Sequence, residues 1–347
     1  MNTSRRQFLC ESLALAASAA ALSCSAESSP SAKSSTAAAG AAGGGGFSGR
    51  SLVVRSRRPP GQAGVTSVRT GPDRFDPAVL DKMLGGCLGR LTNTTDGTAA
   101  WKALFSPKDR VALKVNTLGG LGLSTKPAVA EAIVRGLISA GVPESGILVW
   151  DRFNRELIRA GFQINRSGKG YRCFGTEGDY ETRMTVEGKI GGFLSPLLTD
   201  FPTALINVPI VKDHNLAGVA ISMKNLYGMI DNPNRYHDNN CDPYLADMLS
   251  LPVVRQKMRL IVCDALNGQF EAGPAFHPTF RWEADTILAA TDPVALDTIG
   301  WQMIEAKRRQ VTLKPLAEVG REPRWLKTAA SRGLGQNDPT KIELVDL

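Results

Sequence analysis

The sequence predicts an α/β protein whose largely parallel, twisted sheet has helices on both faces. Short apolar runs recur along the chain, and helical segments separate several of them. These runs are rich in Val, Ile and Leu with little polar alternation, which is typical of strands buried on both faces. Polar side chains follow several runs, as they do where a parallel sheet binds a ligand at the carboxyl ends of its strands.

The first strand of this pattern is expected at 110–116 (RVALKVN). The helix after it should begin near Pro127, because Pro suits the first turn of a helix, and it should end at Gly141. A second strand is expected at 147–150, directly before Asp151. The helix between the two strands has an apolar face at helical spacing, made of Val129, Ile133, Leu137 and Ala140.

The remaining elements continue this pattern to the end of the chain. Asp292 and Pro293 have the residue types of a helix cap and a first helical position, so a helix is expected at 294–306. Further strands are expected at 204–211, 260–262, 286–290 and 342–345. Together these elements predict one α/β domain at 50–347.

The stretch 205–237 is the strongest indication of a functional site. The chain has three histidines, and two of them lie here. Charged and imidazole groups set among apolar runs are costly to bury without a partner, which favours a role in binding or catalysis. The candidates are Lys212, Asp213, His214, Lys224, Asn225 and His237.

Strand geometry predicts how these candidates are oriented. Side chains alternate along a strand, so Lys212 and His214 should face one side and Asp213 the other. Lys224 lies on a helical segment that can fold back over them. We therefore expect Lys212, His214 and Lys224 to line one concave pocket.

Polar residues after the other strands should converge on the same crevice, because parallel strands end at one edge of the sheet. Asp292 is expected mainly to cap its helix, and Asp264 a turn, although Asp264 also falls at this edge. Lys114 has no comparable capping role, which favours a functional one. The residues expected near the crevice are Lys114, Asn116, Asp151, Asp264, Glu271 and Asp297.

Three interpretations of the site follow. In the first, lysines clamp the carboxylate or phosphate of a small molecule, and His214 acts as acid or base near neutral pH. Catalytic roles then fall to His214, Lys212 and Lys224, and ligand binding to Lys114, Asn116, Asp151, Asp213, Asn225, Asp264 and Glu271.

In the second interpretation, His214 and His237 bind a divalent metal together with Asp213 or Asp238. Nearby lysines disfavour a bound cation, so the anion site is preferred. In the third, the chain is a binding or assembly protein of the cell envelope without chemistry. Buried lysines close to His214 would favour catalysis, and solvated, separated lysines would favour a scaffold.

The N-terminus predicts export. Residues 1–24 match a twin-arginine signal peptide, with Arg5-Arg6 before a weakly hydrophobic stretch. Such a signal engages the twin-arginine translocase and carries a folded protein to the periplasm or the outer face of the envelope. Cys24 is a candidate lipidation site, and ordinary cleavage near Ser25 is the alternative. Residues 25–49 are rich in Ser, Ala and Gly and should form a flexible tether.

The net charge and the spacing of the cysteines limit which partners and cofactors are expected. The net charge of +8 becomes +7 without residues 1–24, since Arg5, Arg6 and Glu11 are lost. The basic residues are mostly scattered, so no nucleic-acid partner is expected, and membrane contact is expected only through a lipid anchor. Four cysteines of the domain lack the C-x-x-C spacing of iron–sulfur clusters and zinc sites, so no such cluster is expected and the cofactor stays open: Cys87, Cys173, Cys241 and Cys263.

Several motifs resemble the family known as domain of unknown function 362. They are KVNTLGG at 114–120, INVPIVKDH at 206–214, SMKNLYG at 222–228, ATDPVALDTIG at 290–300 and AASRGLGQNDPTKIEL at 329–344. The resemblance runs from about residue 76 to the C-terminus. It implies an α/β fold and a region for the site, but no substrate. Some members carry a ferredoxin-like iron–sulfur module, and this chain lacks its cysteine cluster.

Overall fold

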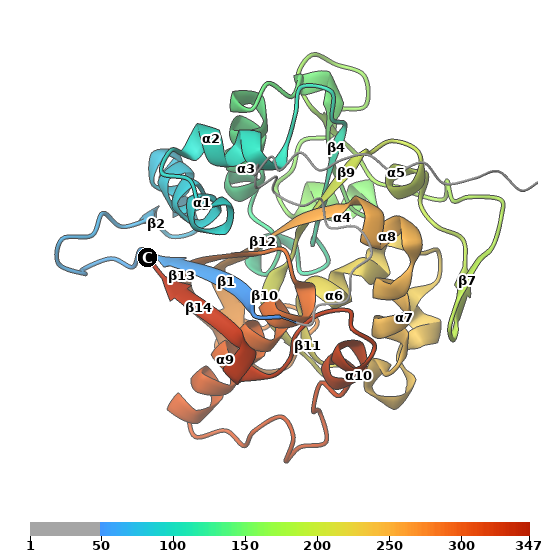
Figure 1. The fold of residues 1–347 in the computed structure, drawn as a ribbon. Helices are drawn as coiled ribbons and strands as arrows, with labels where there is room; N and C mark the ends of the chain where they lie inside the picture. The colour runs from blue at the N-terminus through green and yellow to red at the C-terminus, as the bar shows by residue number, and fades with distance from the viewer. Residues whose placement is uncertain (1–48) are drawn as a thin grey trace, which may run out of the picture. The chain divides into compact units, whose positions relative to one another are not determined.

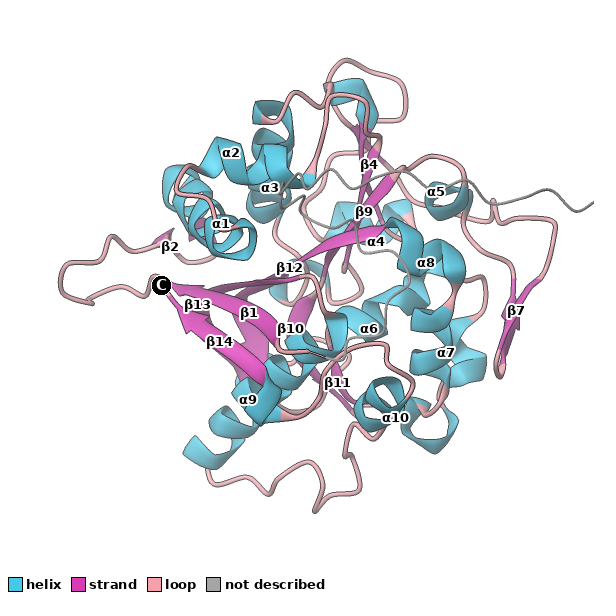
Figure 2. Ribbon diagram, viewed as in Figure 1, coloured by secondary structure: helices cyan, strands magenta, loops and turns pink. Residues whose placement is uncertain are grey.

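The computed structural model describes residues 49–347, whose centre is a mixed sheet of ten strands. Figure 1 shows the path of the chain and Figure 2 its helices and strands. The main strand order is β14 (Ile342–Asp346), β1 (Ser51–Arg57), β13 (Arg281–Ala290), β12 (Met258–Gln269), β9 (Ala204–Val208), β4 (Val111–Val115), β5 (Ile147–Trp150) and β6 (Arg172–Cys173). Beside this path, β10 (Ile210–His214) pairs with β12, and β11 (Gly218–Ala220) pairs with β10.

The predicted α/β fold with a largely parallel sheet is confirmed. Strands β9, β4, β5 and β6 run parallel, and so do β12 with β9, β10 with β12, and β1 with β14. The antiparallel pairs are β1 with β13, β12 with β13, and β10 with β11. The parallel half contains the strands at 111–115 and 147–150, close to where the apolar runs predicted them.

Helices cover both faces of the sheet, as predicted. Consecutive residues of β1, Val53 and Val54, belong to two different clusters of buried apolar side chains, because side chains alternate between the faces. One cluster includes residues of α1 (Pro77–Thr92), α2 (Gly97–Leu104), α3 (Pro127–Ser139) and α4 (Asn154–Arg159). The other includes residues of α5 (Pro196–Thr199), α6 (Ser222–Asn225), α7 (Tyr244–Ser250), α8 (Pro252–Lys257), α9 (Pro293–Gln310) and α10 (Trp325–Ser331).

The expected strand at 204–211 is divided in two. Pro209 has no N–H for the ladder, and it separates β9 from β10. Both pieces pair with the long strand β12, and β10 turns into a hairpin with β11. Lys212, Asp213 and His214 therefore lie within a buried strand, where the sequence placed them at its end.

Strand β12 is also longer than the expected 260–262, which changes the position of Asp264. This residue lies in the middle of β12, away from the carboxyl end where it was expected. Its buried carboxylate accepts hydrogen bonds from the backbone N–H of Lys126 (2.7 Å) and of Leu266 (3.0 Å). These partners allow an acidic side chain to sit inside the strand, and burial raises its pKa to about 6.

The helix caps follow the sequence closely. Asp292 accepts hydrogen bonds from the backbone N–H groups of Val294 (2.8 Å) and Ala295 (3.0 Å) at the start of α9, as predicted. Pro127 opens α3. Gly141 follows the end of α3 with a φ of 94°, in the left-handed region that favours glycine.

Outside the sheet, two short hairpins are formed by β2 (Arg69–Gly71) with β3 (Arg74–Phe75), and by β7 (Thr185–Glu187) with β8 (Ile190–Gly192). All four cysteines within residues 49–347 are buried and unpaired. In that same part of the chain, no helix is long and apolar enough to span a membrane. The expected signal peptide, the tether at 25–49 apart from its last residue, and the lipidation site at Cys24 lie outside the described residues.

Candidate functional site

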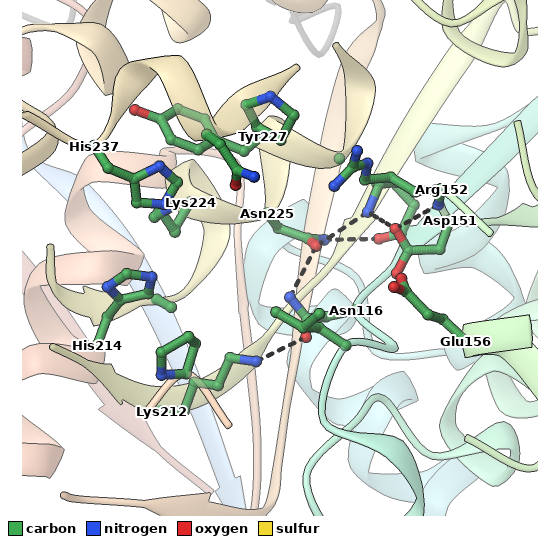
Figure 3. A pocket seen from close by; sticks show the side chains of 17 residues that line it. Asn116, Asp151, Arg152, Glu156, Lys212, His214, Lys224, Asn225, Tyr227 and His237 are labelled. Carbon is green, nitrogen blue, oxygen red and sulfur yellow. Dashed lines mark hydrogen bonds and ion pairs between the residues drawn. The ribbon is translucent and has the colours of Figure 1, made fainter. Parts of the chain in front are cut away.

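A pocket of about 220 Å³ lies beyond the carboxyl ends of β4 and β5, between them and the segment from β10 to residue 237 (Figure 3). Eight residues singled out from the sequence line it: Lys114, Asn116, Asp151, Lys212, His214, Lys224, Asn225 and His237. The expectation that Lys212, His214 and Lys224 share one pocket agrees with this arrangement.

On the β4–β5 side, Lys114 and Asp151 form a buried ion pair. The Lys114 Nζ lies 2.7 Å from Asp151 Oδ1 and also donates to the Val115 carbonyl at 2.7 Å. The other carboxylate oxygen accepts hydrogen bonds from Thr117 N (2.8 Å) and Thr117 Oγ1 (2.7 Å). Burial lowers the Lys114 pKa, while the charge of Asp151 opposes that change.

Two asparagines extend this network toward the centre of the pocket. Asn225 Oδ1 accepts from Asn116 Nδ2 (3.2 Å), as Figure 3 shows, and also from Lys114 Nζ (3.2 Å). Asn225 Nδ2 donates to Asn207 Oδ1 (2.8 Å) and to the Lys114 carbonyl (3.0 Å). Each polar atom of the Asn225 amide thus has defined partners, which fixes its orientation.

Lys212 lines the pocket and is buried. Its Nζ donates to the neutral Asn116 Oδ1 at 3.2 Å. Among the described residues it forms no salt bridge with a carboxylate. Burial is the main cause that lowers its pKa to about 8.

The short helix α6 holds Lys224, and a carboxylate from α9 holds α6. Asp297 accepts hydrogen bonds from the backbone N–H groups of Ser222 (2.7 Å) and Met223 (2.9 Å). These are N–H groups of the first turn, which have no partner within the helix. Asp297, expected near the crevice, is buried beneath it and positions α6 instead of lining the pocket.

Lys224 projects from α6 into the pocket and is partly buried. Its Nζ lies 2.9 Å from His237 Nε2 and 3.9 Å from the centre of the Tyr227 ring. It forms no salt bridge within residues 49–347. Burial is again the main cause, with Lys212 contributing, that lowers its pKa to about 7.

His214 is held in one protonation form. Its Nδ1 accepts hydrogen bonds from the backbone N–H groups of Leu216 (3.1 Å) and Ala217 (3.2 Å), so the neutral ring carries its proton on Nε2. Burial and then the charge of Lys224 lower its pKa to about 2. This lowered pKa favours a neutral His214 that offers its Nε2–H as a hydrogen-bond donor, whereas the sequence suggested an acid or base near neutral pH.

The two histidines of the metal interpretation lie close together. Their rings stack with centres 5.5 Å apart, and His237 Nε2 is engaged by Lys224. Within residues 49–347, no group of three or more His, Cys, Asp or Glu side chains is arranged to hold a metal ion. Asp238 is exposed and does not line the pocket. We therefore do not assign His214 and His237 as metal ligands.

Three other predicted ligand-binding residues do not line the pocket: Asp213, Asp264 and Glu271. Asp213 faces away from Lys212 and His214, as strand alternation predicted, and accepts from Gly273 N (2.9 Å) and Arg321 Nη1 (3.1 Å). Glu271 pairs with Arg321 (2.6 Å) and with Arg308. Asp213 and Glu271 thus form ion pairs with arginines, which sequence spacing could not indicate.

The pocket also has lining residues that were not expected from the sequence, among them Arg152, Glu156, Tyr227 and Gly228. Arg152 directly follows Asp151, so its position after the strand expected at 147–150 could have identified it as a candidate pocket residue. Gly228 is required by close approach: a Cβ there would lie 2.6 Å from both Cε and Nζ of Lys114. Burial raises the pKa of Glu156, and the charge of Asp151 adds to this effect.

A family model matches the part of the chain that contains the pocket residues. The family model described as a domain of unknown function (DUF362) matches residues 111–302, more than half of the chain. No curated protein matches. One similar solved structure is a crystal structure of a Thermotoga maritima protein, at 11% identity and a TM-score of 0.33. That match covers 65% of this chain and 57% of the other. The chain belongs to the domain of unknown function 362 family.

Proposed function

We propose that the pocket binds a small anionic molecule through a carboxylate or phosphate group. One observation carries this proposal: two lysines, Lys212 and Lys224, direct ammonium groups into the pocket without a carboxylate partner among the described residues. A charged group removed from water is costly unless it is paired, and an anion in the pocket would supply that pair.

The neighbouring groups suit an anion as well. His214 is neutral and directs an Nε2–H donor from the same strand as Lys212. Asn116 bridges Lys212 and Asn225, so it fixes the position of the Lys212 ammonium. Lys114 is already paired with Asp151, and we assign it a positioning role in place of the clamp expected from the sequence. A pocket of about 220 Å³ suits a small metabolite and not a polymer.

Of the other interpretations, a scaffold without chemistry fits less well. Lys212 is buried and Lys224 partly buried, and both line one pocket with His214. That arrangement is costly to maintain without a ligand, whereas a scaffold would be served equally well by solvated lysines. The metal interpretation lacks a third ligand among the described residues.

Calorimetric titration of the purified protein tests the proposal, with inorganic phosphate and lactate as probes. We expect at least one probe to bind, Lys212→Met to abolish that binding, and Lys102→Met, a change of an exposed lysine on α2, to leave it unchanged. Affinity should fall as pH rises through about 7 to 8, where Lys224 and Lys212 lose their protons. Binding that survives Lys212→Met, or that requires added divalent metal, would refute the anion site.

We also propose that the protein acts outside the cytoplasm, since Arg5-Arg6 precedes a weakly hydrophobic segment. Replacing both arginines with lysine should leave the precursor in the cytoplasm, as measured by fractionation and immunoblotting. Replacing Arg57 and Arg58 with lysine provides the matched control, because these arginines lie beyond the signal segment. Normal export of the Arg5→Lys, Arg6→Lys protein would refute the twin-arginine assignment.

A further inference from the structure

We infer that Lys224 is a nucleophile that forms an imine with the carbonyl carbon of a small 2-oxo acid whose carboxylate is bound by Lys212. This inference rests on the proposed anion site and adds a substrate class to it. The three lysines of the pocket differ in their partners, and that difference selects Lys224.

Nucleophilic attack requires an amine that can lose a proton to a neighbouring base. Lys114 pairs with the carboxylate of Asp151 at 2.7 Å, and that charge opposes the loss of its proton. Lys212 donates to the amide oxygen of Asn116, which is a poor proton acceptor. Lys224 alone among these three lysines has a ring nitrogen as its partner, His237 Nε2 at 2.9 Å. Desolvation, which lowers the pKa of Lys224 to about 7, supports the same assignment.

The surroundings of Lys224 also suit the product of the reaction. The Tyr227 ring lies 3.9 Å from Nζ, and the electron-rich face of an aromatic ring stabilises a cation such as a protonated imine. The neutral His214 ring stacks on His237 and carries its proton on Nε2, so it can donate to an oxygen that develops negative charge. His237 is half-buried and in contact with solvent, which allows it to exchange the proton.

The step balances without a further reactant. The Lys224 ammonium transfers one proton to His237, and the free amine attacks the carbonyl carbon, so an N–C bond forms and the C–O double bond becomes single. The attacking nitrogen then gives one proton to the oxygen, which yields a neutral carbinolamine. His237 returns its proton as the C–O bond breaks, water leaves, and a protonated C=N bond remains. An ammonium and a ketone thus yield an iminium ion and one water.

Reductive trapping tests this inference on the full-length protein. The protein is incubated with pyruvate and sodium cyanoborohydride, and the adduct is located by intact mass and peptide mapping. We expect one adduct, on Lys224. Lactate, which lacks the ketone, should bind without labelling, and acetone, which lacks the carboxylate, should label far less than pyruvate.

Two variants separate the inference from the anion site. Lys224→Arg cannot form a stable imine, so labelling should be lost. Lactate binding by the native chain, measured by calorimetric titration, reports the anion site independently of labelling. Lys102→Arg, a change at an exposed lysine, should label like the native chain. Lactate binding without any pyruvate adduct, an adduct on Lys212 or Lys114, or equal labelling by acetone would overturn the inference and leave the anion site intact. Loss of all probe binding would overturn both.

Discussion

The two walls of the pocket each contain a buried lysine, but the two lysines have different partners. Lys114 and Lys212 are each 1% exposed, yet Lys114 has a carboxylate at 2.7 Å and Lys212 has only an amide oxygen at 3.2 Å. The β4–β5 wall is therefore closed around Lys114, whose charge is balanced by Asp151. On the β10–α6 wall, Lys212 and Lys224 remain without a counter-charge among the described residues.

This difference teaches that burial alone does not identify a functional lysine. A buried lysine with a carboxylate partner is stabilised as an internal ion pair and has a structural role. Burial lowers the pKa of both lysines, to about 8 for Lys212, but only Lys212 lacks a carboxylate that offsets the cost of its charge. The ionic and hydrogen-bonding partners of the two lysines thus distinguish the two walls, whereas their exposed fractions do not.

The largest expected effect comes from breaking the ion pair of the closed wall. Asp151→Asn keeps the side-chain shape but leaves the Lys114 ammonium buried without its counter-charge. We expect the free energy of unfolding at neutral pH to fall by about 3–5 kcal/mol, as for other broken buried pairs. Urea denaturation monitored by circular dichroism measures this change.

The matched control for this change is Asp81→Asn, which breaks the exposed pair between Asp81 and Arg135. A surface pair contributes about 0–1 kcal/mol, so this variant should be close to the native chain. Equal losses in the two variants would mean that Lys114 and Asp151 are no more coupled than surface charges, and the contrast between the walls would disappear.

The next effect is a gain in stability when Lys212 is replaced on the β10–α6 wall, where it has no counter-charge among the described residues. A Lys212 pKa lowered from 10.5 to about 8 corresponds to about 3 kcal/mol of destabilisation when the residue is charged. The unfolded chain binds more protons than the folded one between these pH values, so stability rises with pH across that window. Lys212→Met should therefore be more stable than the native chain below about pH 8, and this advantage should vanish as pH approaches 10.5.

Denaturation of both proteins at several pH values measures this advantage. Lys102→Met serves as the control, because an exposed lysine should show no such pH-dependent difference. A Lys212→Met protein that is less stable than the native chain at neutral pH would show that Lys212 is a structural residue.

A smaller effect is expected where Gly228 contacts the closed wall. A Cβ at this position would lie 2.6 Å from Lys114 Cε and Nζ and 3.1 Å from Asp151 Oδ1, so Gly228→Ala forces the ion pair to move. We expect a loss of about 1–3 kcal/mol, as for other overpacked sites. Gly85→Ala in α1 is the control, since its Cβ would meet only Gly97 Cα at 3.6 Å. Equal stability of the two variants would contradict the close packing around Lys114.

The smallest loss of stability is expected from Lys224→Ala. Burial lowers the Lys224 pKa to about 7, and the residue has no counter-charge among the described residues, so its removal should not lower the free energy of unfolding. Anion binding, measured by calorimetric titration with phosphate or lactate, should nevertheless be lost. Unfolding of this variant with affinity kept in the folded fraction would make Lys224 structural and refute the anion site.

Much of the fold could be predicted because its signals are local. The apolar run at 147–150, the Pro127 and Gly141 boundaries of α3 and the Asp292 cap depend on residues next to each other in the sequence. Strand alternation likewise predicted that Asp213 turns away from Lys212. The resemblance to a known family located the region of the site.

The sequence by itself thus determined the fold class, several strands and helix boundaries, and eight of the residues that line the pocket. Only the tertiary structure decided their partners. Lys114 and Lys212 both lie near the ends of predicted strands, but only Lys114 has a carboxylate partner, Asp151, on the neighbouring strand. Asp264 and Asp151 both follow apolar runs, but Asp264 is buried within β12. The physical reason is that a counter-charge acts over a few ångströms in space, whichever part of the chain supplies it, so its presence cannot be read from residue spacing.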